Sequence, residues 1–98
     1  MLTHVVIFRT RRKDMADMLY EGAKKLGDID FARGFYCGKP VPSARPVVDD
    51  FFDVAICVHL DDKDALARYA SDPIHVNFVE NCIKPAEAKL TVFDFADD

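Results

Sequence analysis

Hydrophobic and polar residues alternate along several stretches of the chain, which is the pattern of a β-strand with one face toward a core. The first stretch covers residues 2–10, the most hydrophobic covers 51–60, and the last covers 90–95. A shorter apolar stretch at 33–38 predicts another strand, and the prolines that follow it within 39–50 predict a loop. We therefore expect four strands.

A helical pattern occupies the segment between the first two strands. Over residues 13–27, apolar residues recur at intervals of three and four, as in an amphipathic helix. Gly22 lies within the apolar stripe. It either lets the helix approach the sheet closely or leaves space for a ligand, and Gly27 is a plausible stop.

A pair of short helices is predicted between the last two strands. Asp61 is expected to cap the first of them, which ends near Tyr69. Asp72 is a favourable N-cap for the second, and the following proline suits a first helical position, where its missing N–H costs nothing. The second helix is expected over residues 73–83, with Pro85 ending or kinking it.

The order strand, helix, strand, strand, helix pair, strand predicts a single domain over residues 1–98. This βαββαβ order is the ferredoxin-like arrangement of the α+β class, a four-stranded antiparallel sheet with helices on one face. The other sheet face is predicted to be too apolar to remain in water. Its residues are Val5, Ile7, Ala55, Cys57, Phe93 and Phe95. We therefore expect a homodimer that packs sheet against sheet, with His59 near the edge of the interface.

The charge balance restricts the classes of partner. A formal net charge of −4 argues against nonspecific binding to nucleic acid or to an anionic membrane. The basic cluster of Arg9, Arg11, Arg12 and Lys13 has no aromatic residues within it and is interpreted as a solvated connection between strand and helix.

The remaining composition indicates a cytoplasmic protein. No apolar run is long enough to span a bilayer, and the chain begins directly with a strand pattern rather than a signal peptide. The cysteines at 37, 57 and 82 are widely spaced and form neither a metal-type pair nor a disulfide framework. We interpret each as a small buried hydrophobic residue.

Two histidines are the candidates for proton transfer, since histidine titrates near neutral pH. His75 shares the inward face of its helix with Phe78, Val79 and Cys82. His4 alternates in register with the inward residues of the first strand, which are Leu2, Val6 and Phe8. Each histidine is either a general base at an internal pocket or a buried residue whose ring nitrogens bond to protein groups.

Two oxygen-bearing side chains are further candidates. Tyr69 either donates a hydrogen bond to a developing enolate or carbonyl oxygen, or buries its ring with the hydroxyl at the surface. Asp94 either orients a histidine or lies at the sheet edge, in water or paired with Arg9. We favour the second interpretation for Asp94.

Several segments together resemble the stress-responsive A/B barrel (Dabb) domain family. They are the opening Leu2-Thr3-His4-Val5-Val6-Ile7-Phe8, the segment from Tyr69 through Asp72-Pro73-Ile74-His75-Val76-Asn77-Phe78-Val79, Lys84-Pro85, and the ending Val92-Phe93-Asp94-Phe95. The resemblance covers essentially the whole chain. It implies a ferredoxin-like protomer that forms a dimeric α/β barrel. One plant member of the family closes a linear polyketide by aldol condensation, and its catalytic residues correspond by motif to His4, His75 and Tyr69.

Three functions are compatible with these residues. The first is the binding of a small apolar or carbonyl-containing molecule in a pocket between sheet and helices, with Val6, Phe8, Leu19, Phe78 and Val79 as candidate lining residues. The second is a polyketide cyclase-like enzyme that needs neither a metal nor an organic cofactor. The third, a haem or oxygenase role, rests only on analogy with other dimeric barrels.

Overall fold

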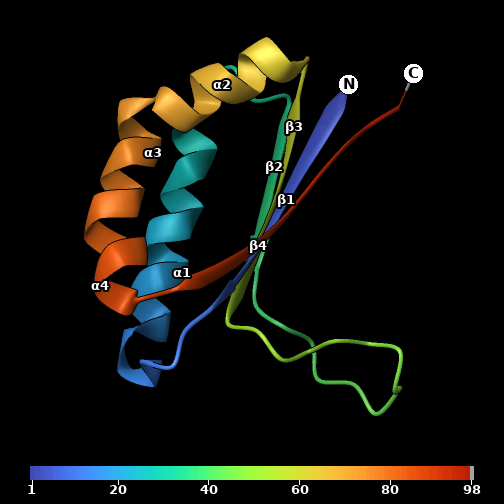
Figure 1. Ribbon diagram of the computed structural model, residues 1–98, viewed down its shortest axis with the longest axis vertical. Coiled ribbons are helices and arrows are strands. Elements are labelled where there is room, and N and C mark those ends of the chain that lie inside the picture. Colours follow the sequence, from blue (N-terminus) through green and yellow to red (C-terminus); the bar gives the residue numbers. More distant parts are fainter. Residues whose placement is uncertain (98) are drawn as a thin grey trace.

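The computed structural model describes residues 1–97 and confirms the predicted fold class. One antiparallel sheet contains the four strands in the order β2-β3-β1-β4, with β1 at Leu2–Arg9, β2 at Gly34–Gly38, β3 at Val54–Leu60 and β4 at Lys89–Ala96. The α-helices are α1 (Ala16–Lys24), α2 (Lys63–Ser71), α3 (Pro73–Phe78) and α4 (Lys84–Ala86). They all lie on one face of the sheet (Figure 1).

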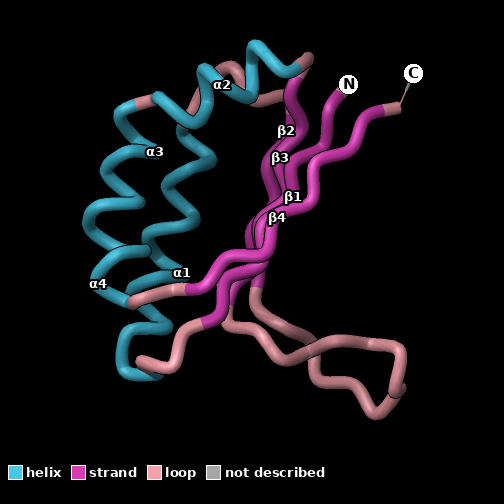
Figure 2. The backbone as a smooth tube through the Cα atoms, viewed as in Figure 1, coloured by secondary structure: helices cyan, strands magenta, loops and turns pink. Residues whose placement is uncertain are grey.

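The hydrophobic core lies between the helices and the inward face of the sheet. Alternate residues of β1 and β3 point into it, and Phe8, Val54, Val58 and Leu60 are at most 1% exposed. The opposite sheet face carries no helix (Figure 2). On that face Phe93 and Phe95 of β4 are 58% and 59% exposed. The register places Val5 of β1 opposite Phe93, so the predicted apolar residues form a continuous surface.

The helix predicted at 13–27 has three parts, since 3₁₀ turns at 13–15 and 25–28 flank α1. Gly22 faces the end of α3 and the turn that follows it, which carry Phe78 and Cys82. An added Cβ at Gly22 would lie 3.2 Å from the Phe78 ring and in direct clash with the sulfur of Cys82. Gly22 therefore allows α1 to pack closely against Phe78 and Cys82. It does not leave space for a ligand, because the space beside it is already filled.

The helix pair is present, with one correction at its start. Asp62, and not Asp61, is the N-cap of α2, because its carboxylate accepts the backbone N–H of Ala65 at 2.9 Å. Asp61 instead pairs with the guanidinium of Arg33 at 2.9 Å. The break at Asp72 is as predicted: its carboxylate accepts the N–H of Ile74, and its extended backbone separates α2 from α3.

The last helical segment runs to residue 86, beyond the predicted end at 83. A π-helical turn at Val79–Ile83 connects α3 to α4, and Pro85 lies within α4. Proline has no N–H to donate, so a change in the hydrogen-bond pattern just before it accommodates the residue without ending the helix.

The strand predicted at 51–60 begins only at Val54. Phe51 is 83% exposed, and the backbone N–H of Asp53 donates to the carbonyl of Phe8 at 2.9 Å rather than joining a β-ladder. The loop therefore extends from residue 39 to residue 53 and projects beyond the end of the sheet (Figure 2). Within residues 1–97, every helix is too short or too polar to cross a membrane.

Candidate functional site

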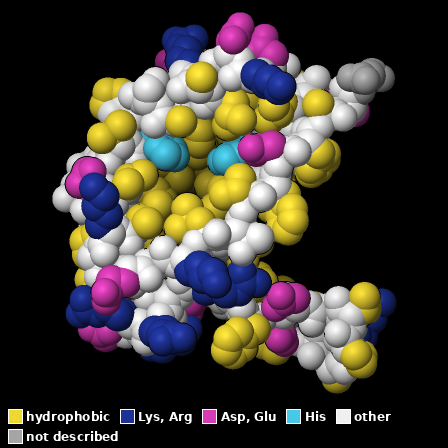
Figure 3. Space-filling model, in the orientation of Figure 1, with side chains coloured by type: hydrophobic (Ala, Val, Ile, Leu, Met, Phe, Trp, Pro, Cys, Tyr) yellow, Lys and Arg dark blue, Asp and Glu magenta, His cyan; other side chains and the backbone are white. Residues whose placement is uncertain are grey.

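A cavity of about 210 Å³ lies between the helices and the inward face of β1 and β4. Figure 3 shows it as a hollow with hydrophobic side chains inside and two histidine side chains at its border. The lining residues come from every layer of the protomer: His4, Val6, Phe8, Leu26, Ile56, Leu66, Tyr69, Ala70, His75, Phe78, Val79, Ile83, Leu90 and Val92. The cavity is thus apolar except at three ring-bearing polar side chains.

The helix break positions two of these polar side chains. Tyr69 is in the last turn of α2 and His75 is in the first turn of α3, on either side of Asp72. The direction of the chain changes at Asp72, and the two rings meet edge to face with their centroids 5.1 Å apart. His4 also meets the tyrosine ring edge to face, at 5.8 Å between centroids. Both histidine rings therefore pack beside Tyr69.

The Tyr69 hydroxyl is the unusual group of the cavity. The side chain is only 1% exposed, yet its oxygen has no hydrogen-bond partner among the described residues. Burial raises the pKa of this hydroxyl well above its usual value, so it remains a proton donor at neutral pH. A buried hydroxyl without a partner costs free energy, and such groups are rare in native proteins.

His75 is held in its neutral form. Burial lowers the pKa of its imidazole, and the nearby His4 lowers it further. The backbone of Ala70 and the carboxylate of Asp72 oppose this shift without reversing it. A neutral imidazole offers one N–H and one lone pair.

His4 is oriented by a carboxylate. Its Nδ1 atom is hydrogen-bonded to Asp94 on the neighbouring strand β4. Asp94 is exposed on the edge strand, as one of the interpretations from the sequence has it, but it does not pair with Arg9, which binds Asp49, Thr91 and the carbonyl of Phe51 instead. When Nδ1–H donates to the carboxylate, Nε2 carries the lone pair.

The predicted lining residues divide into two groups. Four of them, Val6, Phe8, Phe78 and Val79, do line the cavity. Leu19 does not: it is fully buried in the hydrophobic core and is not among the residues that line the cavity.

Other lining residues were missed from the sequence. Leu26 belongs to the apolar stripe of the predicted helix, and Leu90 and Val92 alternate along the last strand, so their inward direction was readable. That these residues meet at one cavity could not be predicted, because it depends on how the last strand packs against the helices.

The arrangement offers one hydroxyl donor and two imidazoles at the wall of an otherwise apolar cavity. A carbonyl oxygen can accept from Tyr69, and a carbon acid beside it can lose a proton to an imidazole nitrogen. Within residues 1–97, no three side chains of the His, Cys, Asp or Glu type are grouped so that they could hold a metal ion.

Comparison with known proteins agrees with this architecture. The sequence model of the stress responsive A/B barrel domain, Dabb, matches residues 2–97. A comparison with curated proteins finds no match.

Three solved structures show the same fold at low sequence identity. A dimeric ferredoxin-like protein of unknown function from Thermobifida fusca is 21% identical with a TM-score of 0.75, covering 98% of this chain and 90% of its own. A Dabb family protein from Mesorhizobium loti is 20% identical with a TM-score of 0.72, covering 99% and 96%. The hydroxynitrile lyase from Passiflora edulis is 16% identical with a TM-score of 0.76, covering 99% and 93%.

Proposed function

The chain belongs to the stress responsive A/B barrel (Dabb) domain family, and we propose that it binds a small, largely apolar carbonyl compound in the cavity between its sheet and helices. The observation that carries this proposal is the buried Tyr69 hydroxyl, which has no hydrogen-bond partner among the described residues. A carbonyl oxygen in the cavity would accept that hydrogen bond and offset the cost of burying the donor.

The size and lining of the cavity define the class of ligand. A volume of about 210 Å³ is below the range of about 300–1,000 Å³ that is usual for drug-sized ligands, so a compound of a single ring fits better. The wall contains leucine, isoleucine, valine and phenylalanine side chains. These favour an apolar body and leave the carbonyl as the group that fixes orientation.

The assembly we propose is a homodimer through the uncovered sheet face. Relatives of the same fold are described as dimeric. On this chain the exposed Phe93 and Phe95 lie beside Val5 and Thr3 of β1, respectively. A continuous apolar surface of this kind is typical of an interface between subunits.

The His4–Asp94 hydrogen bond favours a second candidate function, proton transfer at the carbon next to the carbonyl. The Nε2 lone pair of His4 takes a proton from the α-carbon, and the electron pair of the broken C–H bond forms an enolate. Tyr69 donates a hydrogen bond to the enolate oxygen, and Asp94 stabilises the imidazolium. Attack of the enolate carbon on a second carbonyl of the same molecule would be an aldol cyclisation, as in a polyketide cyclase.

The neutral His75 lines the cavity beside Tyr69. Its imidazole is close enough to the tyrosine ring to restrict the position of a bound carbonyl. In the proton-transfer reaction it is the second group that can accept or return a proton. The hydroxynitrile lyase from Passiflora edulis supports this reaction class only as an analogy of fold.

Binding is tested with acetophenone and cumene, two single-ring compounds of similar shape of which only acetophenone has a carbonyl. We expect acetophenone to bind about fivefold more tightly, because one net hydrogen bond is worth about 1 kcal/mol. In Tyr69→Phe this preference disappears, while the affinity for cumene is kept. Isothermal titration calorimetry or ligand-detected NMR measures both constants.

The matched control is Tyr36→Phe, because Tyr36 is 63% exposed on the sheet and does not line the cavity. It should leave both affinities unchanged. Equal binding of acetophenone and cumene by the natural protein would overturn the proposal.

The second candidate is tested with the same ligand in D₂O. Exchange of the methyl protons of acetophenone for deuterium reports enolisation directly and is followed by proton NMR. We expect His4→Gln to abolish the catalysed exchange without abolishing binding. Exchange no faster than in buffer would reject this reaction and leave the binding proposal standing.

A further inference from the structure

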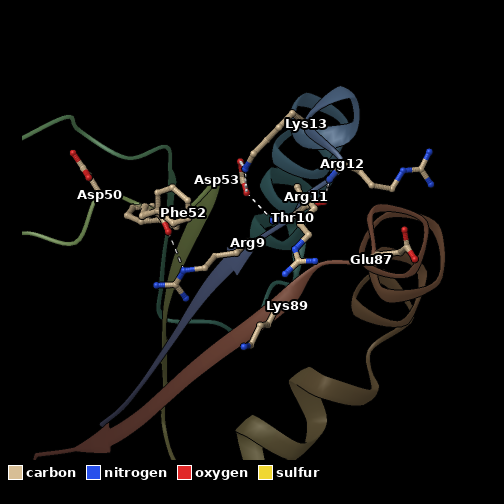
Figure 4. Close-up of a pocket in the computed structure, with 11 residues that line it drawn as sticks. Arg9, Thr10, Arg11, Arg12, Lys13, Asp50, Phe52, Asp53, Glu87 and Lys89 are labelled. Carbon is tan, nitrogen blue, oxygen red and sulfur yellow. Dashed lines mark hydrogen bonds and ion pairs between the residues drawn. The ribbon is translucent and has the colours of Figure 1, made fainter.

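A second pocket, of about 730 Å³, lies at the end of the sheet from which the 39–53 loop projects. Its wall combines the turn after β1, the start of β4 and the end of that loop (Figure 4). Among residues 1–97, none lines both this pocket and the histidine cavity. Its volume lies within the range usual for small-molecule sites, about 300–1,000 Å³.

The wall of this pocket is fixed by buried hydrogen bonds. Thr10 is 4% exposed, and its hydroxyl donates to the carbonyl of Ala86 at 2.6 Å and accepts the N–H of Arg12 at 2.9 Å. The N–H of Thr10 donates to the carboxylate of Asp53 at 2.7 Å. Segments far apart in the sequence are thereby held together, so the pocket is formed before any ligand arrives.

The pocket concentrates cations on a chain whose net charge is −4. Five basic residues line it: Arg9, Arg11, Arg12, Lys13 and Lys89. Three of them have carboxylate partners, since Arg9 pairs with Asp49, Lys13 with Asp53 and Arg12 with Asp14.

The other two cations, Arg11 and Lys89, form no ion pair with any carboxylate of residues 1–97. The acidic residues of the wall are Asp50, Asp53 and Glu87. Asp53 is bound to Lys13, whereas Asp50 accepts the backbone N–H of Ser43 and keeps its charge, so Asp50 and Glu87 are the wall carboxylates without a cationic partner among the described residues. Arg11, Arg12 and Lys13 lie in an exposed connection between β1 and α1, as expected from the sequence, and they also line this pocket.

Aromatic side chains form the apolar part of the wall. Phe52 lies on the loop side of the pocket, across from the turn that carries Arg11 (Figure 4), and Phe51, its neighbour in the loop, also lines the pocket. A planar guanidinium binds a carboxylate through two parallel N–H donors, and an ammonium adds a further charge. Aromatic rings accept a planar apolar body next to that anionic group.

We propose that this pocket binds an aromatic carboxylate, with Arg11 and Lys89 holding the carboxylate and the two phenylalanines contacting the ring. The site is separate from the histidine cavity and does not depend on the function proposed for it. The ligand class follows from the free cations together with the apolar wall.

The test is an NMR titration of the ¹⁵N-labelled protein with benzoate and with benzamide, which has the same shape without the charge. Benzoate should shift the amides of residues 9–13 and 89 and bind at least about fivefold more tightly than benzamide, with an affinity that weakens as salt is added. The double variant Arg11→Gln/Lys89→Gln should remove that preference. The control Lys25→Gln/Lys63→Gln changes net charge equally at exposed positions outside the pocket and should keep it.

Three results would overturn the proposal: unmoved amides at residues 9–13, equal affinity for benzoate and benzamide, or an unchanged benzoate affinity in Arg11→Gln/Lys89→Gln. Benzoate shifts confined to the amides around Tyr69 and His75 would also overturn it, while leaving the cavity proposal in place.

Discussion

The imidazole of His4 is hydrogen-bonded to the carboxylate of Asp94, although 90 residues separate them in the chain. The antiparallel register of β1 and β4 places the two directly opposite each other on the face that carries the helices. This contact fixes the orientation of the His4 ring through its Nδ1 atom. The first strand thus supplies the histidine and the last strand supplies the group that orients it.

Asp94→Asn is expected to slow the exchange of acetophenone protons at saturating ligand by at least about tenfold, because the imidazolium loses its counter-charge. The dissociation constant for acetophenone should stay within about twofold, since Asp94 is not among the residues that line the cavity. Deuterium exchange and calorimetry measure the two quantities. Asp30→Asn, at an exposed position, is the control, and a loss of binding equal to the loss of rate would contradict an orienting role.

Tyr69→Phe is expected to increase the free energy of unfolding by about 1 kcal/mol, because it removes a buried hydroxyl that has no partner. Urea denaturation of the ligand-free protein measures this change. Tyr20→Phe should have almost no effect, since the Tyr20 ring is only partly buried and its hydroxyl is not a buried group without a partner. A clear loss of stability in Tyr69→Phe would mean that the hydroxyl bonds to a protein group.

The stability of the fold is expected to decrease as the pH falls below about 6.5, in part through His75. Burial lowers the pKa of His75 in the folded state, so the unfolded chain binds more protons between the folded and unfolded pKa values. The contribution of His75 to the free energy of unfolding is fully present above the pKa of His75 in the unfolded chain. It is lost as the pH falls toward the pKa of His75 in the folded protein. Urea midpoints at pH 7.5 and 5.5 should therefore differ less in His75→Gln than in the natural protein, and an equal difference would contradict the shift.

Gly22→Ala is expected to destabilise the protein by about 1–3 kcal/mol, the usual cost of overpacking. The added methyl group would clash with the sulfur of Cys82 and lie 3.2 Å from the ring of Phe78. In a Cys82→Ala background the loss of stability caused by Gly22→Ala should be smaller, because the sulfur of Cys82 that meets the added methyl group has been removed. Thermal unfolding of the four proteins of this cycle measures the coupling, and strictly additive effects would count against the clash.

Phe93→Lys is expected to convert the proposed homodimer to a protomer of 11.1 kDa. The side chain is 58% exposed on the uncovered sheet face, so the change places a charge in the interface while the fold of the protomer is kept. Light scattering after size-exclusion chromatography measures the mass. Val76→Lys, on the exposed side of α3, should remain dimeric; dimeric Phe93→Lys would place the interface elsewhere.

Local patterns in the sequence account for most of the fold. Alternation around His4 and helical spacing around His75 gave the inward direction of both residues, and the N-cap at Asp72 gave the helix break. One error, the start of the third strand, falls where groups far away in sequence decide the structure. Phe51–Asp53 has a strand-like composition, but the Asp53 N–H bonds to Phe8 and its carboxylate to Thr10.

For the same reason, the candidate site could be predicted only in part from the sequence. The residue types that can transfer protons were evident, whereas the pairing of Asp94 with His4 depends on the register between the first and last strands. Likewise, the position of Tyr69 beside both histidine rings depends on how the helices pack on β1. Neither relationship is a property of a short segment.

The pairing of β1 with β4 also has a consequence for the order in which the protein is made. A nascent chain synthesised only as far as Ile83 already contains His4, Tyr69 and His75, but it lacks the strand that carries Leu90, Val92 and Asp94. Until that strand has been synthesised, β1 is the edge strand of a three-stranded sheet and one wall of the cavity is missing. The cavity is therefore complete only after Asp94 has been added to the chain and β4 has paired with β1.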